Sequence, residues 1–330
     1  MTTQTTSPPA AAPVGGFGPP SPVVFVEGAY LSLEDARVST HANVLSYGTG
    51  TFEGIRASWN DDHEELYLLE AFAHYERMAR SARVLGLDLP YGTDELVTIS
   101  AELLRRNEIR SDAYLRPLYV LAGDELPVRM KGVPTRFQIA VTPIVGDYIA
   151  LSGVRCTISS WRRAPDDVLP GRAKLCGSYV GPALAKSEAL ARGYDEALML
   201  NSAGHVAEGT TSNLFMRRGE AWFTPAATDD ILEGITRAQV MDLLAERTGR
   251  AVTERSIQRS ELHVCDELLL CGTAALVVPV VSVDDRPVGT GEAGGVTRWL
   301  LDELRGVARR AGDRSHHWTT PVYASGNGYR

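Results

Sequence analysis

The stretch AKLCGSYVGPALAKSEALARGYDEALML, residues 173–200, decides how the second half of the chain is organised. Its first lysine, Lys174, follows a Pro-Gly turn and stands among small residues, and Tyr179 comes five positions later. A helix is predicted over about 182–192, because a proline marks its start and a glycine follows its end. The apolar run EALMLN then predicts a strand. This order places an amine at the end of a turn inside a domain that mixes helices and strands.

The same mixture runs through the rest of the chain. Apolar residues recur at helical spacing in 69–87, and further helices are predicted over 93–107, 235–249 and 296–311. The runs AYLRPLYVLA and RFQIAVTPIV are dense in Tyr, Val, Ile and Leu and predict strands. Because strands and helices do not alternate strictly, we predict an α+β fold around largely antiparallel sheets rather than a doubly wound one.

The length of 330 residues favours two domains over one hydrophobic core. The regular pattern loosens near residues 146–153, where we place the boundary. The first residues are rich in Pro, Ala, Gly and Thr, which is typical of a disordered tail. The predicted parts are a tail over 1–22, a small domain over 23–146, an interdomain loop over 147–155, a large domain over 156–312 and a C-terminal tail over 313–330.

Composition and charge argue against several classes of protein. An apolar share of 44%, a charged share of 22% and a net charge of −8, without any dense Lys/Arg block, favour small-molecule chemistry over nucleic-acid binding. The sequence has neither an apolar run long enough to span a membrane nor the regions of a signal peptide. The cysteines lack the spacing of a metal site or a disulfide framework, so we expect no metal and a reducing cytoplasm. They are Cys156, Cys176, Cys265 and Cys271.

Two residues are candidates for catalysis. Lys174 can attack a carbonyl when its amine is neutral, and burial among small residues lowers the pKa of a lysine; the alternative is a solvated lysine near a turn. The segment AEGTTSNLF, residues 207–215, places the carboxylate of Glu208 at a strand end, where it could keep a pyridine nitrogen protonated. The alternative is a strand-to-turn element whose hydroxyl groups bond their own backbone.

Two turns are candidates for binding an anion. LEGITRAQVM, residues 232–241, begins a helix after a glycine, so the N–H groups of Ile235 and Thr236 and the Thr236 hydroxyl could face a phosphate. CGTAALVVP, residues 271–279, offers the Thr273 hydroxyl in the same way. A helix cap and a plain turn explain these segments nearly as well. The glycine-rich YGTGTFEG, residues 47–54, matches no nucleotide-binding loop.

Together these segments resemble the class IV family of pyridoxal-phosphate enzymes, fold type IV, and most closely the branched-chain amino-acid aminotransferases. The resemblance covers about 24–312 and includes HANVLSYGTGTFEGIRA, HYERMARSARVLG, AYLRPLYV, the lysine segment, AEGTTSNLF, GITR and CGTAA in the family's order. It implies a small α/β domain, a larger mainly antiparallel β domain with flanking helices, and pyridoxal 5'-phosphate (PLP) as cofactor. A homodimer is also implied, because family members complete each site with a loop of the neighbouring subunit.

The resemblance also implies a role for each candidate residue. Lys174 would form the internal aldimine with PLP and shuttle the proton, Tyr179 would bond the cofactor's phenolate oxygen, and Glu208 would pair with its pyridinium nitrogen. The phosphate would be held by Arg77, Ile235, Thr236 and Thr273. The substrate's α-carboxylate would meet the N–H groups of Thr273 and Ala274. The side-chain pocket, which must hold both an aliphatic chain and the γ-carboxylate of glutamate, would be formed by Tyr47, Phe52, Arg56, Tyr114 and Arg116, with Arg116 taking the charge.

The implied reaction is transamination between an L-branched-chain or other apolar amino acid and 2-oxoglutarate or another 2-oxo acid. Two segments depart from the branched-chain pattern: EGTTSN replaces a more usual EGxGEN, and CGTAAL puts Leu276 where a glutamate is commoner. These departures keep open D-amino-acid transamination, aminodeoxychorismate-type elimination and a specialised aminotransferase of secondary metabolism. A non-catalytic binding protein with the same fold is the alternative from another class, although Arg77, Lys174, Tyr179 and Glu208 are all retained.

Overall fold

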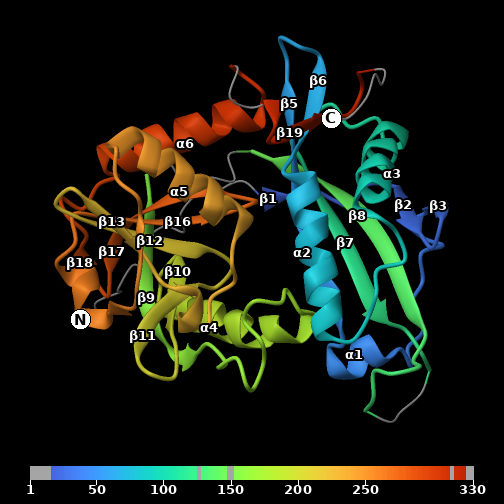
Figure 1. Cartoon of the computed structure of the whole chain (residues 1–330), viewed down its shortest axis with the longest axis horizontal. Coiled ribbons are helices and arrows are strands. Elements are labelled where there is room, and N and C mark those ends of the chain that lie inside the picture. Colours follow the sequence, from blue (N-terminus) through green and yellow to red (C-terminus); the bar gives the residue numbers. More distant parts are fainter. Residues whose placement is uncertain (1–15, 125–127, 147–151, 313–315, 325–330) are drawn as a thin grey trace, which may run out of the picture.

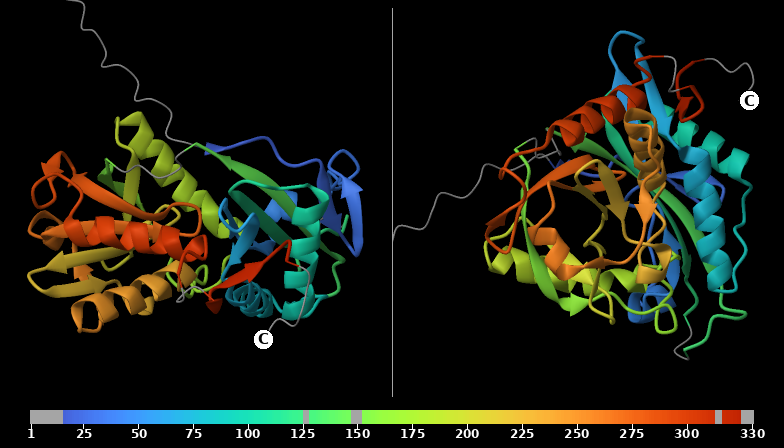
Figure 2. Two further views of the ribbon diagram at one scale, coloured as in Figure 1. Left: turned by 90° about the horizontal axis from the view of Figure 1, so that it is seen from above. Right: turned by 60° about the vertical axis from the view of Figure 1, so that its left-hand side comes forward.

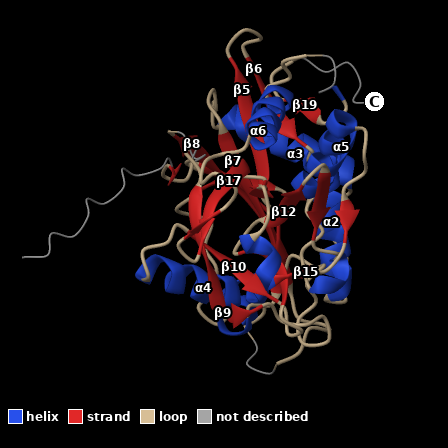
Figure 3. Ribbon diagram, turned by 90° about the vertical axis from the view of Figure 1, so that its left-hand side faces the viewer, coloured by secondary structure: helices blue, strands red, loops and turns tan. Residues whose placement is uncertain are grey.

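The computed structural model describes residues 16–124, 128–146, 152–312 and 316–324. Within them the chain forms two sheet-based domains that lie side by side, as Figure 1 and the view from above in Figure 2 show. Helices lie on the outside of the strands, which Figure 3 makes clear by colour. The α+β architecture expected from the sequence is therefore confirmed.

The small domain is built on one sheet with the strand order β19-β6-β5-β7-β8-β2-β3, to which β1 adds beside β8 and β4 beside β7. All of its pairings are antiparallel. Its strands are β1 (Gly16–Phe17), β2 (Val23–Val26), β3 (Ala29–Ser32), β4 (Gly50–Phe52), β5 (Ile55–Asn60), β6 (Glu65–Leu69), β7 (Ala113–Leu121), β8 (Thr135–Val145) and β19 (Thr319–Pro321).

Helices α2 (Ala71–Val84) and α3 (Thr93–Arg106) cover this sheet. Tyr75, Met78 and Leu104 pack from the helices against Leu115 and Phe137 of the strands, and all five are buried. A shorter helix, α1 (Asn43–Tyr47), ends at Gly48, whose φ of 64° suits a residue without a β-carbon.

The large domain is a second sheet with the order β14-β13-β12-β16-β17-β9-β10-β11-β15, and β18 adds beside β17. β9 runs parallel to both β10 and β17, while most other pairs are antiparallel. The strands are β9 (Val154–Arg162), β10 (Glu196–Leu200), β11 (His205–Gly209), β12 (Asn213–Arg218), β13 (Ala221–Thr224), β14 (Thr253–Glu254), β15 (Ile257–Gln258), β16 (Glu267–Gly272), β17 (Leu276–Val283) and β18 (Arg286–Pro287).

Three helices flank the large sheet. α4 (Val180–Ala191) connects β9 to β10 and packs Ala185 and Ala189 against Ala197 and Met199. On another side of the domain, α5 (Ile235–Thr248) and α6 (Gly295–Ala308) bury Leu243, Leu300 and Leu304 with strand residues that include Leu269 and Leu276. Because the buried side chains of α4 are small, the helix lies close to the parallel strands β9 and β10. This close packing positions the lysine turn, which directly precedes α4.

Both ends of the described chain belong to the small-domain sheet. Residues 16–22, which the sequence places in the tail, run along β8, and β1 pairs with its last residues. At the other end β19 pairs with β6, and the Glu65 carboxylate accepts hydrogen bonds from the backbone N–H groups of residues 322–324. Val322 is fully buried in the small-domain core. The C-terminal residues after 315 therefore complete a sheet that began near the N-terminus.

Candidate active site

Lys174 lies in the turn between β9 and α4, but small-domain residues hold its backbone. Its N–H donates to Ser81 Oγ of α2 at 3.0 Å. Its carbonyl accepts from Thr51 Oγ1 at 2.9 Å and from the Phe52 N–H at 3.1 Å. Next to it, a β-carbon on Gly48 would lie 2.8 Å from the Cα of Gly177, so the two backbones can approach this closely only with glycine at position 48. The small residues around the lysine thus allow the two domains to close on this turn.

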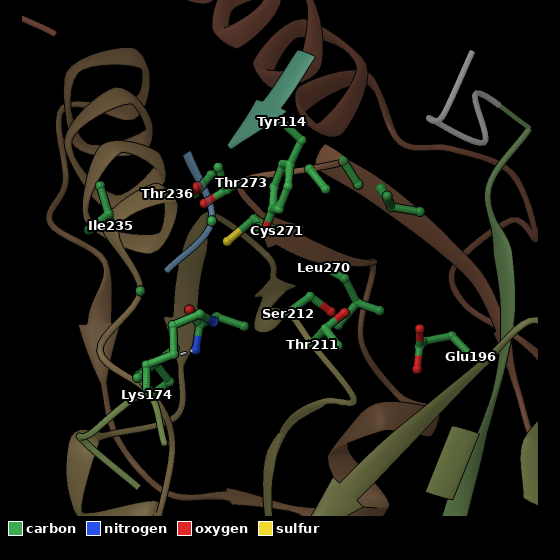
Figure 4. Close-up of a pocket in the computed structure, with 18 of the residues that line it drawn as sticks. Tyr114, Lys174, Glu196, Thr211, Ser212, Ile235, Thr236, Leu270, Cys271 and Thr273 are labelled. Atoms are coloured by element: carbon green, nitrogen blue, oxygen red, sulfur yellow. Dashed lines mark hydrogen bonds between the residues drawn. The ribbon is translucent and has the colours of Figure 1, made fainter. Parts of the chain in front are cut away.

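The Lys174 amine points into the cavity between the domains (Figure 4). Its Nζ donates a hydrogen bond to the Tyr179 hydroxyl at 2.6 Å and lies 4.8 Å from the centre of the Phe52 ring. Burial, together with the positive charge of Arg77, lowers the pKa of the Lys174 amine to about 8. The neutral form, which is the state that attacks a carbonyl, is therefore far more populated near physiological pH than in a solvated lysine, although the ammonium still predominates.

Tyr179 reaches Lys174 because a single 3₁₀ turn, Cys176–Tyr179, joins the lysine turn to α4. The ring packs edge-on against Phe52 with a centroid distance of 4.7 Å. Burial raises the pKa of the Tyr179 hydroxyl, and the nearby Glu208 adds to this effect. The phenol therefore stays protonated and can donate to an oxygen anion in the cavity.

Glu208 lies at the end of β11 and is buried. Its Oε2 accepts from Asn213 Nδ2 at 3.0 Å and from the Leu232 N–H at 3.2 Å, while Oε1 is 3.2 Å from Arg163 Nη2. Burial raises the pKa of this carboxyl, and Arg163 opposes the shift. Arg163 was not a sequence candidate, because nothing in the pattern at the end of β9 pairs it with a residue 45 positions away.

Arg77 projects from α2 and is held by a residue that the sequence analysis did not single out. Its Nε and Nη2 donate to the two oxygens of Glu53 at 2.7 and 2.9 Å, and its Nη1 donates to the Glu233 carbonyl at 3.2 Å. A guanidinium has five N–H donors, so two remain for an anion in the cavity. His74 Nδ1 also lies 2.8 Å from Glu53. Glu53 is the only acidic residue in YGTGTFEG, residues 47–54. This isolated carboxylate is the one sequence feature that could have marked it as a functional residue.

The start of α5 faces the same cavity. Gly234 is the N-cap, and a β-carbon there would lie 2.0 Å from Asn213 Oδ1, so the approach requires glycine. The first intrahelical bond runs from Ala238 to the Gly234 carbonyl, which leaves the N–H groups of Ile235 and Thr236 available to an anion. Thr273, from the turn between β16 and β17, lines the cavity beside them.

These groups line one cavity of about 510 Å³, a volume typical of small-molecule sites. It brings together a nucleophilic amine, a phenol and a set of anion-binding donors, and Glu208 lies buried beside a small adjoining hollow. A phosphate fits the two free Arg77 donors and the α5 N-terminus, and a protonated ring nitrogen fits Glu208, which can accept a further hydrogen bond. The donor set therefore fits a phosphorylated pyridine aldehyde such as PLP.

Phe52, Tyr114, Arg116, Thr273 and Ala274 line the same cavity. The Arg116 guanidinium lies 4.7 Å from the Phe52 ring centre and 5.3 Å from that of Tyr114. Among the described residues, no carboxylate pairs with this arginine. Arg116 therefore presents an uncompensated positive charge between two aromatic walls.

Two sequence candidates do not line the cavity. Arg56 donates through Nη1 to the Ala274 carbonyl at 2.6 Å and through Nη2 to Asp112, so its guanidinium supports the 273–274 turn from outside. Tyr47, on α1, is 39% exposed. The cavity instead contains Phe17, from the segment that the sequence assigned to the tail.

The described residues contain no cluster of His, Cys, Asp and Glu that could hold a metal ion. None of the described helices is long and apolar enough to cross a membrane.

Comparison with known proteins points in one direction. Residues 50–283 match the family described as amino-transferase class IV. A probable branched-chain-amino-acid aminotransferase of Aquifex aeolicus is 44% identical over 300 residues, which are 91% of this chain and 96% of that protein.

Two solved structures are similar over 92% of this chain. The branched-chain aminotransferase of Thermoproteus uzoniensis with norvaline has a TM-score of 0.87 and 38% identity, with 100% of its chain covered. The branched-chain amino acid aminotransferase of Thermobaculum terrenum, in its PLP form, has a TM-score of 0.87 and 34% identity, with 99% of its chain covered.

Proposed function

We propose that this chain, which belongs to the amino-transferase class IV family, is a PLP-dependent enzyme that transfers the amino group of L-branched-chain amino acids to 2-oxoglutarate or another 2-oxo acid. The observation that carries the proposal is a single cavity in which the Lys174 amine, with its lowered pKa, shares space with aromatic walls and the unpaired Arg116.

Holding the cofactor is the first task of the chain's residues. Arg77 would bind the phosphate with its two free donors, and the N–H groups of Ile235 and Thr236 would complete the cradle with the hydroxyls of Thr236 and Thr273. Glu208 would face the ring nitrogen, and Arg163 keeps a positive charge on the far side of this carboxylate. When bound, PLP supplies an aldehyde that carries the amino group and a ring that accepts electrons from the substrate's α-carbon.

Moving a proton is the second task, and we assign it to Lys174. Its Nζ would take the proton from the substrate α-carbon in one direction and return it in the other. A pKa of about 8 suits this exchange, because the amine passes readily between its neutral and charged states near neutral pH. The hydrogen bond to Tyr179 fixes the direction of the amine, and burial of this phenol keeps its proton available to an oxygen anion.

Substrate selection is the third task, and the cavity offers both kinds of contact that it requires. An aliphatic side chain would lose water against Phe52 and Tyr114, whereas the γ-carboxylate of glutamate would pair with Arg116. The α-carboxylate of either substrate would meet the N–H groups of Thr273 and Ala274. Arg56 holds the carbonyl of Ala274 and so orients these donors.

The two departures from the branched-chain pattern differ in their weight. Leu276 is buried in the core with α5 and α6 and does not line the cavity, so it has no direct contact with a substrate. Thr211 and Ser212 do line the cavity, next to Asn213. Of the two departures, only the EGTTSN segment lies where it can contact a substrate. Because of this segment, amino donors other than branched-chain amino acids must also be tested.

A homodimer is the assembly that we propose. Leu45 on α1 and Val180 and Leu184 on α4 are 63%, 64% and 40% exposed. The Gly177 N–H in the 3₁₀ turn before α4 donates to the carbonyl of Gly48, which follows α1, so this bond connects the end of one helix to the approach of the other. An apolar surface next to the site suits a second copy of the chain, and sedimentation velocity of the wild type and Leu45→Glu would test it. We place the enzyme in the cytoplasm, where its four free cysteines would stay reduced.

The first experiment is the absorbance spectrum of the holoenzyme before and after excess L-leucine, without an oxo acid. We expect the aldehyde-form band to be replaced by the band of the aminated cofactor, and 2-oxoglutarate to restore it. A spectrum that changes with D-alanine but not with L-leucine would reject the branched-chain donor. Borohydride reduction and peptide mapping should locate the cofactor on Lys174, and the other two lysines, Lys131 and Lys186, are internal controls.

A further inference from the structure

The first described residues form a strand that reaches the active-site cavity. Gly16 and Phe17 pair with Val145 and Ile144 at the end of β8. The Gly18 N–H donates to the Pro143 carbonyl at 2.9 Å, and the Ser21 N–H donates to the Val141 carbonyl at 2.8 Å. The segment is thus tied to β8 along its length. Figure 1 shows β1 where the two domains meet.

This attachment places the Phe17 side chain in the cavity that holds Lys174. Its ring lies 5.1 Å from the ring of Tyr114, with an interplanar angle of 56°. Tyr114 in turn lies directly over Gly54, where a β-carbon would be 1.6 Å from the tyrosine hydroxyl. Because Tyr114 occupies the space that a side chain at position 54 would need, its ring is seated against the backbone there, and the two rings form one apolar corner of the cavity.

The Phe17 ring is the last in a row of described side chains that leads outward from the lysine. From the amine outward, Lys174 lies beside Phe52, Arg116 lies between Phe52 and Tyr114, and Tyr114 contacts Phe17. A substrate side chain that extends away from Lys174 therefore passes Arg116 before it reaches Phe17. Phe17 is 43% exposed, so part of its ring can still be covered by an apolar group.

Phe17 lies outside residues 50–283, the part of the chain that matches the family. The ring reaches the cavity from a segment, GGFGPPSP, in which it is the only large side chain. The contribution of this segment therefore comes from outside the region that matches the family.

We propose that Phe17 is a specificity-determining residue that forms the outer apolar wall of the side-chain pocket and favours branched aliphatic donors over glutamate. The proposal rests on the transaminase function proposed above. An aliphatic side chain covers the Phe17 ring and is removed from water there. The γ-carboxylate of glutamate gains nothing from this ring, because it is bound by Arg116 and has to remain hydrated or paired.

The test compares Phe17→Ala and Phe17→Leu with the wild-type holoenzyme, and Val145→Ala is the matched control. Val145 packs beside Gly18 on the same strand pair but does not line the cavity. Calorimetric titration with 4-methylpentanoate, which has the carbon skeleton of leucine without the amine, measures binding apart from turnover. Steady-state kinetics with L-leucine and L-glutamate measure selectivity.

For Phe17→Ala we expect the Kd of 4-methylpentanoate and the KM of leucine to rise about tenfold, the scale of losing part of an apolar pocket. Glutamate kinetics should change less than twofold, and Phe17→Leu and Val145→Ala should stay near wild type. Unchanged leucine parameters, or an equal loss for glutamate, would overturn the proposal. If the wild type neither turns over leucine nor binds 4-methylpentanoate, the proposed branched-chain function is wrong. The Phe17 proposal is then tested with the substrates that the enzyme does accept: Phe17→Ala should lower the preference for apolar over charged donors, and an unchanged preference would overturn it.

Discussion

Glu53 and Arg77 form a two-point ion pair in which both carboxylate oxygens are used, at 2.7 and 2.9 Å, and the Glu53 side chain is 0% exposed. Burial by itself would raise the pKa of Glu53, but Arg77 and His74 hold it well below its usual range. The same burial lowers the pKa of His74, although Glu53 opposes the shift. The net result is one carboxylate that fixes one guanidinium, with two donors left facing the cavity.

The first prediction follows from this pair. Glu53→Gln removes the charge that orients Arg77, and we expect the Kd of PLP to rise at least tenfold and the unfolding free energy of the apoprotein to fall by about 3 kcal/mol. Cofactor titration followed by fluorescence and urea unfolding would measure the two effects. Glu76→Gln, on the exposed face of the same helix, is the control. Tight PLP binding by the Glu53 variant would show that Arg77 needs no positioning partner.

A second prediction concerns the Lys174 amine. In the apoprotein its reactivity toward acetic anhydride should rise through about pH 8, because burial and Arg77 lower its pKa to that value. A fully solvated lysine titrates at about pH 10.4, and the peptide that carries the exposed Lys131 is labelled in the same samples as an internal reference. Arg77→Gln should move the Lys174 transition upward, since one of the two effects is removed. Mass spectrometry of the acetylated peptides at several pH values gives both curves, and a Lys174 curve that coincides with that of Lys131 would reject the lowered pKa.

The third prediction separates the two arginines of the substrate side. Arg116→Gln should raise the KM of glutamate and 2-oxoglutarate at least tenfold and leave leucine within about threefold, because a charged hydrogen bond is lost only for the dicarboxylates. Arg56→Gln should instead lower kcat/KM for all donors alike, since this arginine orients the 273–274 turn that every α-carboxylate would meet. Steady-state kinetics with two donors measure the difference. Identical profiles for the two variants would contradict it.

The fourth prediction concerns Glu70, which lies between the domains. Burial raises the pKa of its carboxyl to about 7, while a hydrogen bond from Gln239 of α5 opposes the shift. A carboxyl whose folded pKa is above its unfolded value costs stability as the pH rises from about 4.5 to 7, and the full cost remains above that. Glu70→Gln should therefore raise the unfolding free energy by on the order of 1 kcal/mol at about pH 8 and have little effect at about pH 4.5. Urea unfolding at the two pH values measures this, and an equal gain at both would exclude titration of Glu70 as the cause.

The sequence predicted those parts of the site in which the residues are close in the chain, because local secondary structure then determines how they lie relative to one another. Lys174 and Tyr179 are one turn apart, and Ile235 and Thr236 start a helix, so their proximity or their exposed N–H groups followed from local structure. Glu53 and Arg163 act through partners 24 and 45 positions away, and no local pattern indicates such pairs.

The fold shows the same division. Helices α2 to α6 and the strands β7, β8 and β10 were evident from periodicity and composition, whereas the short helix α1 was not predicted. β4, β5 and β6 were not assigned from the sequence. Glycine or polar residues interrupt β4 and β5, and the apolar run of β6 is short and leads directly into the helix predicted from residue 69. β1 and β19 are short and are held by pairing with distant strands, so composition favoured tails at both ends.

The pairing of β19 with β6 also affects the order in which the protein can be completed during translation. β6 lies at residues 65–69, whereas its neighbour β19 lies at 319–321 and the N–H groups that Glu65 accepts follow directly. A nascent chain that still lacks its last residues has an unpaired edge at β6 and a buried carboxylate without its donors. The small domain therefore completes its sheet only after residues 319–324 have been synthesised, although β6 itself is made early.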